Sequence, residues 1–334
     1  MKKKGYVRNE TMKDSICPEA PDSRPTEGLT NRLAGMIPFP TQLIIPVQAI
    51  LLFLLVVPAL LSIWLSLVSW QPTFGIGIFS AKFLGLKNFI DLLTEPRFLY
   101  AVLRTFYITT ITVVVELLIG LGLALLSERA RSLRKFFILI LILPMMFPPV
   151  VTGNTFYMLF FSEGPINAII SFFLGAPFKF NWLSSPTYAI YPIMIAEIWQ
   201  WYPLMFLIMV SGLRGLPPNQ LHAADVLGAS PWQMFCRIKL PLLKPIILIA
   251  IVIRSMEILK MFDVIYIMTR GGPGTATENI NLYMYEVGLK TFRISYISAG
   301  AWILLGISVV IFVNLLKPLL HKVEKFEQKV EEAQ

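Results

Sequence analysis

Six long blocks of apolar residues constrain the fold of this chain more than any other feature. A helix crosses the ~30 Å apolar core of a bilayer with about 20 residues, because it rises ~1.5 Å per residue. The composition agrees, since 56% of the 334 residues are apolar and 15% are charged, against about 25% charged in a soluble domain. The sequence therefore predicts an all-α polytopic membrane protein and argues against a soluble enzyme. The predicted spans are approximately 42–69, 102–126, 136–161, 187–211, 245–266 and 296–316.

The Lys and Arg residues between these blocks are unevenly distributed, which predicts the orientation of the chain. Cytoplasmic segments carry the excess of Lys and Arg in membrane proteins. Segments 1–41, 127–135, 212–244 and 317–334 together hold 19 of these residues, whereas 70–101, 162–186 and 267–295 hold 7. Both termini are therefore predicted to be cytoplasmic, as tails 1–41 and 317–334 on either side of a membrane domain, 42–316. The net charge of +9 then follows from topology and predicts no nucleic-acid partner.

The N-terminal segment is polar to about residue 35, so it predicts a mobile tail rather than a signal peptide. The two cysteines, Cys17 and Cys236, both lie in segments predicted to be cytoplasmic and do not have the spacing of metal ligands. No disulfide and no metal site are predicted from them.

The cytoplasmic stretch 212–244 is too long for a simple turn and predicts a helix, a turn and a second helix. Pro217-Pro218 suits the first turn of a helix, Gly228 suits a left-handed end, and Ser230 with Gln233 forms a capping-box pattern. Several apolar residues share one side of this segment, and an alternative is a pair of helices lying on the membrane surface. These residues are Ala223, Ala224, Leu227, Met234 and Phe235.

This stretch resembles the cytoplasmic loop of permease subunits of binding-protein-dependent ABC importers. That loop carries Glu-Ala-Ala, then Gly three residues later, then Ile-x-Leu-Pro; the chain matches it at Ala223, Ala224, Gly228, Ile238, Leu240 and Pro241. The resemblance implies that these residues, with His222, Leu227 and Phe235, dock on an ATPase subunit and couple its closure to the membrane helices. His222 replaces the family's Glu and Leu227 replaces an acidic residue, so we expect docking to depend mainly on apolar packing.

Other motifs are similar to the carbohydrate-type branch of these permeases. The resemblance implies a sugar or related polyol as the substrate and a bacterial or archaeal inner membrane as the location. It also implies three partners: a second homologous permease, an ATPase dimer and an extracellular binding protein. The motifs are FLGLKNF at 83–89, EPRF at 95–98, GPIN at 164–167, EIWQWYP at 197–203 and the stretch 260–285.

A turn is predicted to end the helix at the outer end of the fifth block, at Gly271, Gly272 and Pro273. Glycine and proline favour turns, and the Ser, Thr and Asn residues beyond them can bond their own backbone. A plain exposed turn is one interpretation. The resemblance implies a loop that contacts the binding protein.

Four charged residues with alternating sign lie three residues apart in the fifth block: Arg254, Glu257, Lys260 and Asp263. Residues at i and i+3 meet on a helix surface, so they predict a ladder of ion pairs in which the charges cancel. Charges at membrane depth need such neutralisation. We expect a structural role for this ladder rather than direct contact with a substrate.

Glu197 in the fourth block lies beside Trp199 and Trp201, a combination that can hold a sugar or serve only in packing. Relatives of the maltose type contact sugar in the fifth span, at positions that correspond to Glu257, Ile258 and Met261. These six residues are the predicted candidates for the substrate path. Glu116 in the second block is a further buried acid, which can be protonated or face a partner helix.

No phosphate-binding G-x-x-x-x-G-K-[ST] motif occurs in the chain, so an ATPase must be a separate polypeptide. The sequence predicts no catalytic residue, metal or cofactor, because His222 and His321 are isolated and no nucleophile–base set shares a membrane edge. A rival function is a secondary transporter that works without an ATPase, but it predicts inverted repeats that the sequence does not display.

Overall fold

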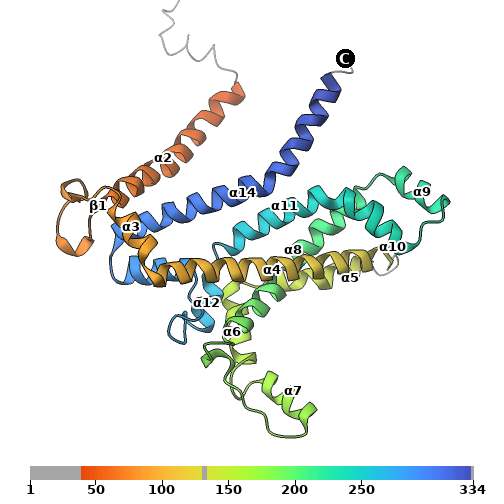
Figure 1. Ribbon diagram of the computed structural model, residues 1–334, viewed down its shortest axis with the longest axis horizontal. Helices are drawn as coiled ribbons and strands as arrows, with labels where there is room; N and C mark the ends of the chain where they lie inside the picture. Colours follow the sequence, from red (N-terminus) through yellow and green to blue (C-terminus); the bar gives the residue numbers. More distant parts are fainter. Residues whose placement is uncertain (1–38, 130–133, 332–334) are drawn as a thin grey trace, which may run out of the picture. The chain divides into compact units, whose positions relative to one another are not determined.

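The computed structural model describes residues 39–129 and 134–331 (Figure 1). These residues are mostly helical, and their only strands are one short antiparallel pair, β1 (Val68–Ser69) and β2 (Lys82–Phe83). The chain divides into two units, 1–59 and 60–334, and the contacts below are within the second. The predicted mobile tail and Cys17 lie outside the described residues.

Four helices are long and apolar enough to cross a membrane. They contain the segments Ile44–Leu67, Pro96–Glu128, Ile190–Arg214 and Ile294–Lys317, which overlap four of the six predicted spans. The helices are α2 (Phe39–Leu67), α4 (Pro96–Arg129), α8 (Ile190–Arg214) and α14 (Ile294–Glu331). Helix α14 continues to Glu331, so the segment predicted as a C-terminal tail begins as helix.

The predicted third span is not one straight helix. It consists of α5 (Arg134–Ile142), η3 (Leu143–Met146) and α6 (Pro149–Leu159), with a bend of 90° between the two arms. Pro148 is extended at the bend and Pro149 begins α6, since proline lacks an N–H group and restricts the residue before it. The Phe147 carbonyl accepts a 2.7 Å hydrogen bond from Gln200 Nε2, which satisfies the backbone at the break.

The predicted fifth span is also interrupted. Helix α11 (Leu240–Ile258) ends before Lys260, and α12 (Asp263–Met268) begins after a short non-helical segment. Side-chain amides stabilise this break, because Asn279 donates to the carbonyl of Met261 at 2.5 Å and Asn281 donates to that of Leu259 at 2.6 Å. Within the described ranges, four apolar helices and one bent pair are long enough to cross a membrane, so the predicted count of six spans is not confirmed.

The segment predicted to be cytoplasmic contains α9 (Pro218–Val226) and turns at Gly228, whose φ of 74° requires the left-handed conformation that glycine adopts readily. Helix α10 (Pro231–Gln233) then starts with the predicted capping box of Ser230 and Gln233. This second helix does not end at Gln233, because η5 (Met234–Lys239), a π-helical turn, joins it to α11.

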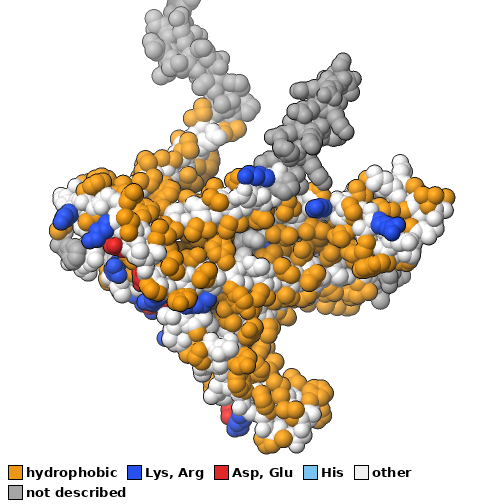
Figure 2. Space-filling view, viewed as in Figure 1, with side chains coloured by type: hydrophobic (Ala, Val, Ile, Leu, Met, Phe, Trp, Pro, Cys, Tyr) orange, Lys and Arg blue, Asp and Glu red, His pale blue; other side chains and the backbone are white. Residues whose placement is uncertain are grey.

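The core lies mainly between α4 and α8, which run alongside each other (Figure 1). Gly120 permits their close approach, because a Cβ there would lie 2.7 Å from the Cβ of Met205. Met205, Phe206 and Met209 are fully buried at this contact. Hydrophobic side chains also cover much of the outer face of α4 and α5 (Figure 2), as expected of surfaces that meet lipid.

The remaining short elements form the end of the molecule opposite α9 and α10 and the connection between α6 and α8 (Figure 1). They are η1 (Pro72–Phe74), η2 (Ile78–Ser80), α3 (Lys87–Thr94), α7 (Pro165–Leu174), η4 (Trp182–Ser184), α13 (Ile280–Met284) and η6 (Tyr285–Lys290).

Candidate functional site

Arg254 is the centre of a buried cluster of charges that joins three helices. It is 1% exposed and donates from Nε and one terminal nitrogen to both carboxylate oxygens of Glu116 in α4, at 2.7 and 3.0 Å. The terminal nitrogen that bonds Glu116, Nη2, also donates to a carboxylate oxygen of Glu197 in α8 at 2.5 Å. The other terminal nitrogen, Nη1, donates to a carboxylate oxygen of Glu257 at 3.2 Å. Two carboxylates from neighbouring helices therefore neutralise this buried guanidinium, and bidentate geometry makes the pairing strong.

The predicted ladder of four charges is wrong. Only the Arg254–Glu257 pair has the i, i+3 contact. Because α11 ends at Ile258, Lys260 and Asp263 do not continue the same helical row, and neither forms an ion pair within residues 39–129 and 134–331. The sequence indicated that Glu116, Glu197 and Arg254 were each unusual in an apolar block, but the packing that pairs them joins residues up to 138 positions apart.

A pocket of about 270 Å³ lies beside this cluster, and we call it the inner pocket. It brings together four of the six predicted substrate-path residues: Glu197, Trp201, Glu257 and Met261. The other two do not line it, because Trp199 stacks on Phe147 with ring centroids 6.0 Å apart and Ile258 is buried in the core. The lining residues are Pro149, Glu197, Trp201, Arg254, Glu257, Lys260, Met261, Phe262, Asp263 and Val264.

The inner pocket offers both donors and acceptors to a bound molecule. The side chain of Glu257 is 44% exposed, and Lys260 and Asp263 are also exposed, so these groups retain hydrogen-bonding capacity. Arg254 lies over the ring of Trp201, 5.0 Å from its centroid, which fixes the indole. An array of carboxylates, an ammonium group and an aromatic ring suits a molecule with many hydroxyl groups.

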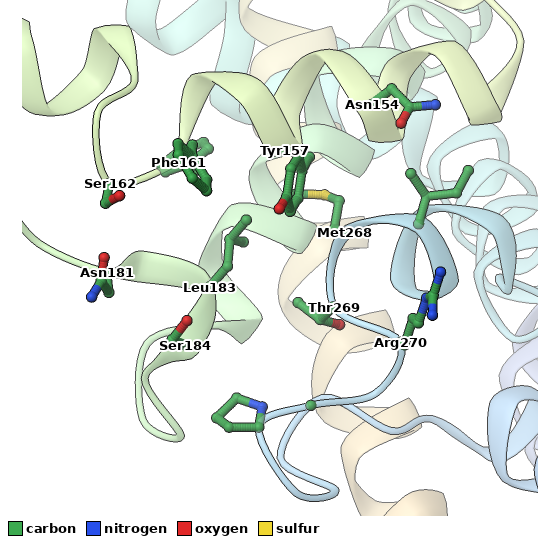
Figure 3. Close-up of a pocket in the computed structure, with 14 residues that line it drawn as sticks. Asn154, Tyr157, Phe161, Ser162, Asn181, Leu183, Ser184, Met268, Thr269 and Arg270 are labelled. Carbon is green, nitrogen blue, oxygen red and sulfur yellow. The ribbon is translucent and has the colours of Figure 1, made fainter.

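A second, larger pocket of about 570 Å³ lies where α6 ends and the turn after α12 begins (Figure 3); we call it the outer pocket. Three segments far apart in the sequence contribute its walls. Gly272 and Pro273, predicted to contact a binding protein, are part of it, whereas Gly271 is not. The lining residues are Asn154, Tyr157, Phe160, Phe161, Ser162, Asn181, Leu183, Ser184, Ile267, Met268, Thr269, Arg270, Gly272 and Pro273.

The glycine-rich turn at this pocket is internally bonded. The hydroxyl of Thr277 lies 2.7 Å from that of Thr269 and 2.9 Å from the Gly272 carbonyl, as the composition of the loop predicted. Gly271 has a φ of 84°, and a Cβ there would lie 2.8 Å from the side chain of Leu282. The turn is therefore held in one shape against α13.

The EPRF motif contributes two contacts that fasten this end of the molecule. Arg97 donates to both carboxylate oxygens of Glu278, at 2.9 and 2.6 Å, while Glu95 accepts from the hydroxyls of Tyr283 and Tyr296 at 2.6 Å each. Burial and the bond to Glu95 raise the pKa of Tyr283, so this hydroxyl stays protonated. These roles were not apparent from the sequence, because the partners lie more than 180 residues away.

At the opposite end, α9, α10 and the turn between them expose three large apolar side chains, Val226, Leu227 and Trp232, which we call the apolar patch. Val226 and Leu227 are each 87% exposed and Trp232 is 72% exposed. The prediction included Leu227 but missed Val226 and Trp232, although an exposed tryptophan two residues after a helix cap was a visible signal.

The other predicted coupling residues are distributed around this patch. Ala224 is buried, His222, Ala223, Gly228 and Pro241 are exposed, and Phe235, Ile238 and Leu240 are half-buried. Lys239 forms a 2.7 Å ion pair with Glu128 at the end of α4. The α9–α10 segment is therefore linked to α4 by an ion pair and to α11 by the continuous helix through η5.

Comparisons with known proteins agree over most of the chain. Residues 116–322 match the family described as "binding-protein-dependent transport system inner membrane component". The trehalose/maltose transport system permease protein MalF of Thermococcus litoralis is 32% identical over 249 residues, 73% of this chain and 81% of the relative. The sulfoquinovosyl glycerol transport system permease protein SmoG of Agrobacterium fabrum is 33% identical over 281 residues, 84% of this chain and 90% of the relative.

The fold also matches a solved structure. A chain from a bacterial ABC transporter involved in the import of the acidic polysaccharide alginate superposes with a TM-score of 0.70. The match covers 82% of this chain and 92% of the other at 22% identity, so it concerns the fold alone.

Proposed function

The chain belongs to the family of binding-protein-dependent transport system inner membrane components, and on this premise we propose that it is the permease subunit of an ABC importer for a sugar or related polyol. The observation that carries the proposal is the inner pocket, where groups suited to hydroxyl ligands line a cavity between membrane helices. The names of the relatives MalF and SmoG support a sugar-containing solute.

The proposal assigns substrate contact to Glu197, Trp201, Glu257 and Met261, with Lys260 as an additional donor. Arg254 and Glu116 have a positioning role, because they are already bonded to each other and hold α4, α8 and α11 together. Trp199 and Ile258 are proposed to act through packing.

The energy is proposed to come from a separate ATPase dimer, since the chain lacks a phosphate-binding loop and is not itself proposed to catalyse a reaction. The apolar patch of Val226, Leu227 and Trp232 is the proposed centre of the docking surface. The coupling residues predicted around it, including His222 and Gly228, would move with the ATPase subunit when it closes. Helices η5 and α11 would transmit that movement to the membrane helices.

The proposed arrangement places the protein in a bacterial or archaeal inner membrane, with both termini and α9–α10 in the cytoplasm. The distribution of Lys and Arg, 19 inside and 7 outside, supports this orientation. The turn at Gly271, Gly272 and Pro273 would then face the extracellular binding protein, and a second homologous permease would complete the path. The membrane domain is proposed to cover 42–316, with the coupling segment at 212–244.

Reconstitution of the intact complex in proteoliposomes tests this function. We expect ATP hydrolysis to rise and labelled sugar to accumulate only when the sugar-loaded binding protein and ATP are both supplied, on opposite sides of the membrane. The alternative is a secondary transporter, which would accumulate sugar in response to an ion gradient without ATP or an ATPase. That result would overturn the proposal.

A further inference from the structure

The outer pocket is more than a surface for docking a binding protein. Resting on the proposed function, we propose that it is a second saccharide site, which holds part of a neutral sugar chain before that part reaches the inner pocket, and that the contact between Gly153 and Ile267 separates the two sites. Size, lining, charge and the path between the pockets each support it.

The outer pocket is large enough for a small-molecule site. Its volume of about 570 Å³ is twice that of the inner pocket, about 270 Å³, and ligand pockets in proteins hold about 300–1,000 Å³. The inner pocket alone is therefore small for an extended saccharide, whereas the two together offer room for one.

The lining of the outer pocket combines aromatic rings with polar groups that have hydrogen-bonding capacity to spare. Tyr157, Phe160 and Phe161 supply rings, which can stack on the C–H face of a sugar. In the part of the chain that the structure describes, no protein group bonds the side chains of Tyr157, Asn181 or Arg270. Polar groups of this kind, converging on one cavity from separate segments, suit a hydroxylated ligand.

The charges of the two pockets favour a neutral saccharide over an acidic one. Arg270 is the only ionisable side chain with a charge at neutral pH among the 14 residues of the outer pocket. The inner pocket has three carboxylates, Glu197, Glu257 and Asp263, against Arg254 and Lys260. An anion would meet attraction in the outer pocket and repulsion in the inner one, whereas a neutral sugar can enter both.

The same two helices line both pockets. On α6, Pro149 lines the inner pocket and Tyr157 the outer one, eight residues or ~12 Å apart. On α12, Val264 lines the inner pocket and Met268 the outer one. A ligand that moves along α6 and α12 would pass from one site to the other.

Gly153 lies midway between Pro149 and Tyr157, at the spacing i, i+4 that keeps residues on one helix face. A Cβ at Gly153 would lie 3.3 Å from the Cβ of Ile267 in α12, so the helices meet closely between the two pockets. A sugar chain can span both sites only when α6 and α12 separate here.

A disulfide across this contact tests the path for any sugar that the complex transports. The Cβ–Cβ separation in a disulfide is about 3.5–4.5 Å, close to that of Gly153 and Ile267, so Gly153→Cys with Ile267→Cys should cross-link in the reconstituted complex. Uptake of glucose, maltose and maltotriose, whichever the wild type transports, should fall at least tenfold on oxidation and recover on reduction. Ile267→Cys alone, treated identically, is the matched control. Uptake that persists in the cross-linked complex would show that the contact does not lie on the path.

Variants of the outer pocket test the site itself. Asn181→Ala and Arg270→Ala should lower uptake of maltotriose at least fivefold while glucose uptake and sugar-stimulated ATP hydrolysis stay near wild type. Equal loss for every sugar, with weaker affinity for the binding protein, would make the pocket a docking surface and overturn the second site. Unchanged uptake of all sugars would also overturn the second site. The proposed function would still hold in that case if the loaded binding protein stimulates ATP hydrolysis. Absence of that stimulation in the wild type would instead reject the proposed function.

Discussion

Arg254 is the residue whose loss should cost the most stability. Arg254→Met leaves Glu116 and Glu197 buried and facing each other without a cation, and breaking a buried ion pair costs about 3–5 kcal/mol. We expect a marked fall in the thermal unfolding temperature of the purified protein. Lys260→Met is the matched control, because Lys260 is exposed.

A triple variant separates charge from packing at the same place. Adding Glu116→Gln and Glu197→Gln to Arg254→Met should recover much of the lost stability, since neutral groups are cheaper to bury than unpaired charges. If Arg254→Met alone unfolds at the wild-type temperature, the cluster does not stabilise the bundle.

Glu257 offers the cleanest test of substrate contact, because its side chain is 44% exposed and Glu197 is committed to Arg254. Glu257→Gln keeps the shape but removes a charged acceptor, and charged hydrogen bonds contribute about 1.5–3 kcal/mol. We expect KM for the transported sugar to rise at least fivefold with little change in stability. Trp199→Ala serves as the comparison and should leave KM unchanged, because Trp199 lies outside the inner pocket; the opposite pattern would contradict the assignment.

Individual residues were predictable from the sequence only as exceptions to their surroundings. Glu197, Arg254 and Glu257 were recognisable as charges in apolar blocks, and all three line the inner pocket. The ion-pair partners of these residues were not predictable. The spacing of three residues within the fifth block favoured a ladder along one helix, whereas Arg254 in fact pairs with residues on two other helices.

At the scale of elements, the α9–α10 patch should determine coupling. Leu227→Asp or Trp232→Ala changes a side chain that is more than 70% exposed, so the fold of this subunit should be preserved while an apolar docking surface is lost. We expect transport and sugar-stimulated ATP hydrolysis to fall at least tenfold, with normal insertion in the membrane.

Asn219→Asp is the matched control for the patch, since Asn219 is exposed in the first turn of α9 and a negative charge there favours the helix. Ala224 is a less suitable site, because it is buried and Ala224→Asp would also disturb this subunit's own packing. Full coupling in Leu227→Asp would mean that the ATPase docks elsewhere.

The break between α11 and α12 should depend on Asn279. Its amide donates to the Met261 carbonyl, and its side-chain oxygen accepts from the backbone N–H of Leu282 at 3.0 Å. Asn279→Leu leaves the backbone N–H of Leu282 unpaired and the Met261 carbonyl with only the longer, 3.3 Å bond from Asn281. A buried polar group left unpaired costs about 1–3 kcal/mol. Lower thermal stability than in Asn314→Leu, an exposed position in α14, is the expected result; equal stability in the two variants would contradict it.

The two helix interruptions differ in how far the sequence revealed them. Pro148 and Pro149 mark the bend before α6 by removing backbone donors, a signal that is visible in the sequence. No proline or glycine marks the break after Ile258, which depends on Asn279 and Asn281 from a distant segment. The capping box at Ser230 and the turn at Gly228 were predictable because their determinants are local.

At the scale of the whole molecule, the length of the apolar blocks predicted the helical class. The second and fourth blocks became α4 and α8, which form the core, and this packing needs only long helices with small residues such as Gly120 at the contact. The two pockets could not be predicted from hydropathy. They lie where helices are interrupted and polar groups are exposed, whereas the hydropathy pattern assigns these same residues to continuous membrane spans.

Topology gives the last prediction. The 19-to-7 distribution of Lys and Arg orients the chain so that α9 lies in the cytoplasm and the segment after α6 lies outside. In a background with Cys17→Ser and Cys236→Ser, Glu163→Cys should react with a membrane-impermeant maleimide in intact cells. In cells that produce this subunit without its ATPase partner, Leu227→Cys should react only after permeabilisation. Both native side chains are exposed, and no docked subunit then covers Leu227, so access to the reagent depends on the membrane. Labelling of Leu227→Cys in intact cells would reverse the orientation, and with it the sides from which ATP and the binding protein reach this subunit.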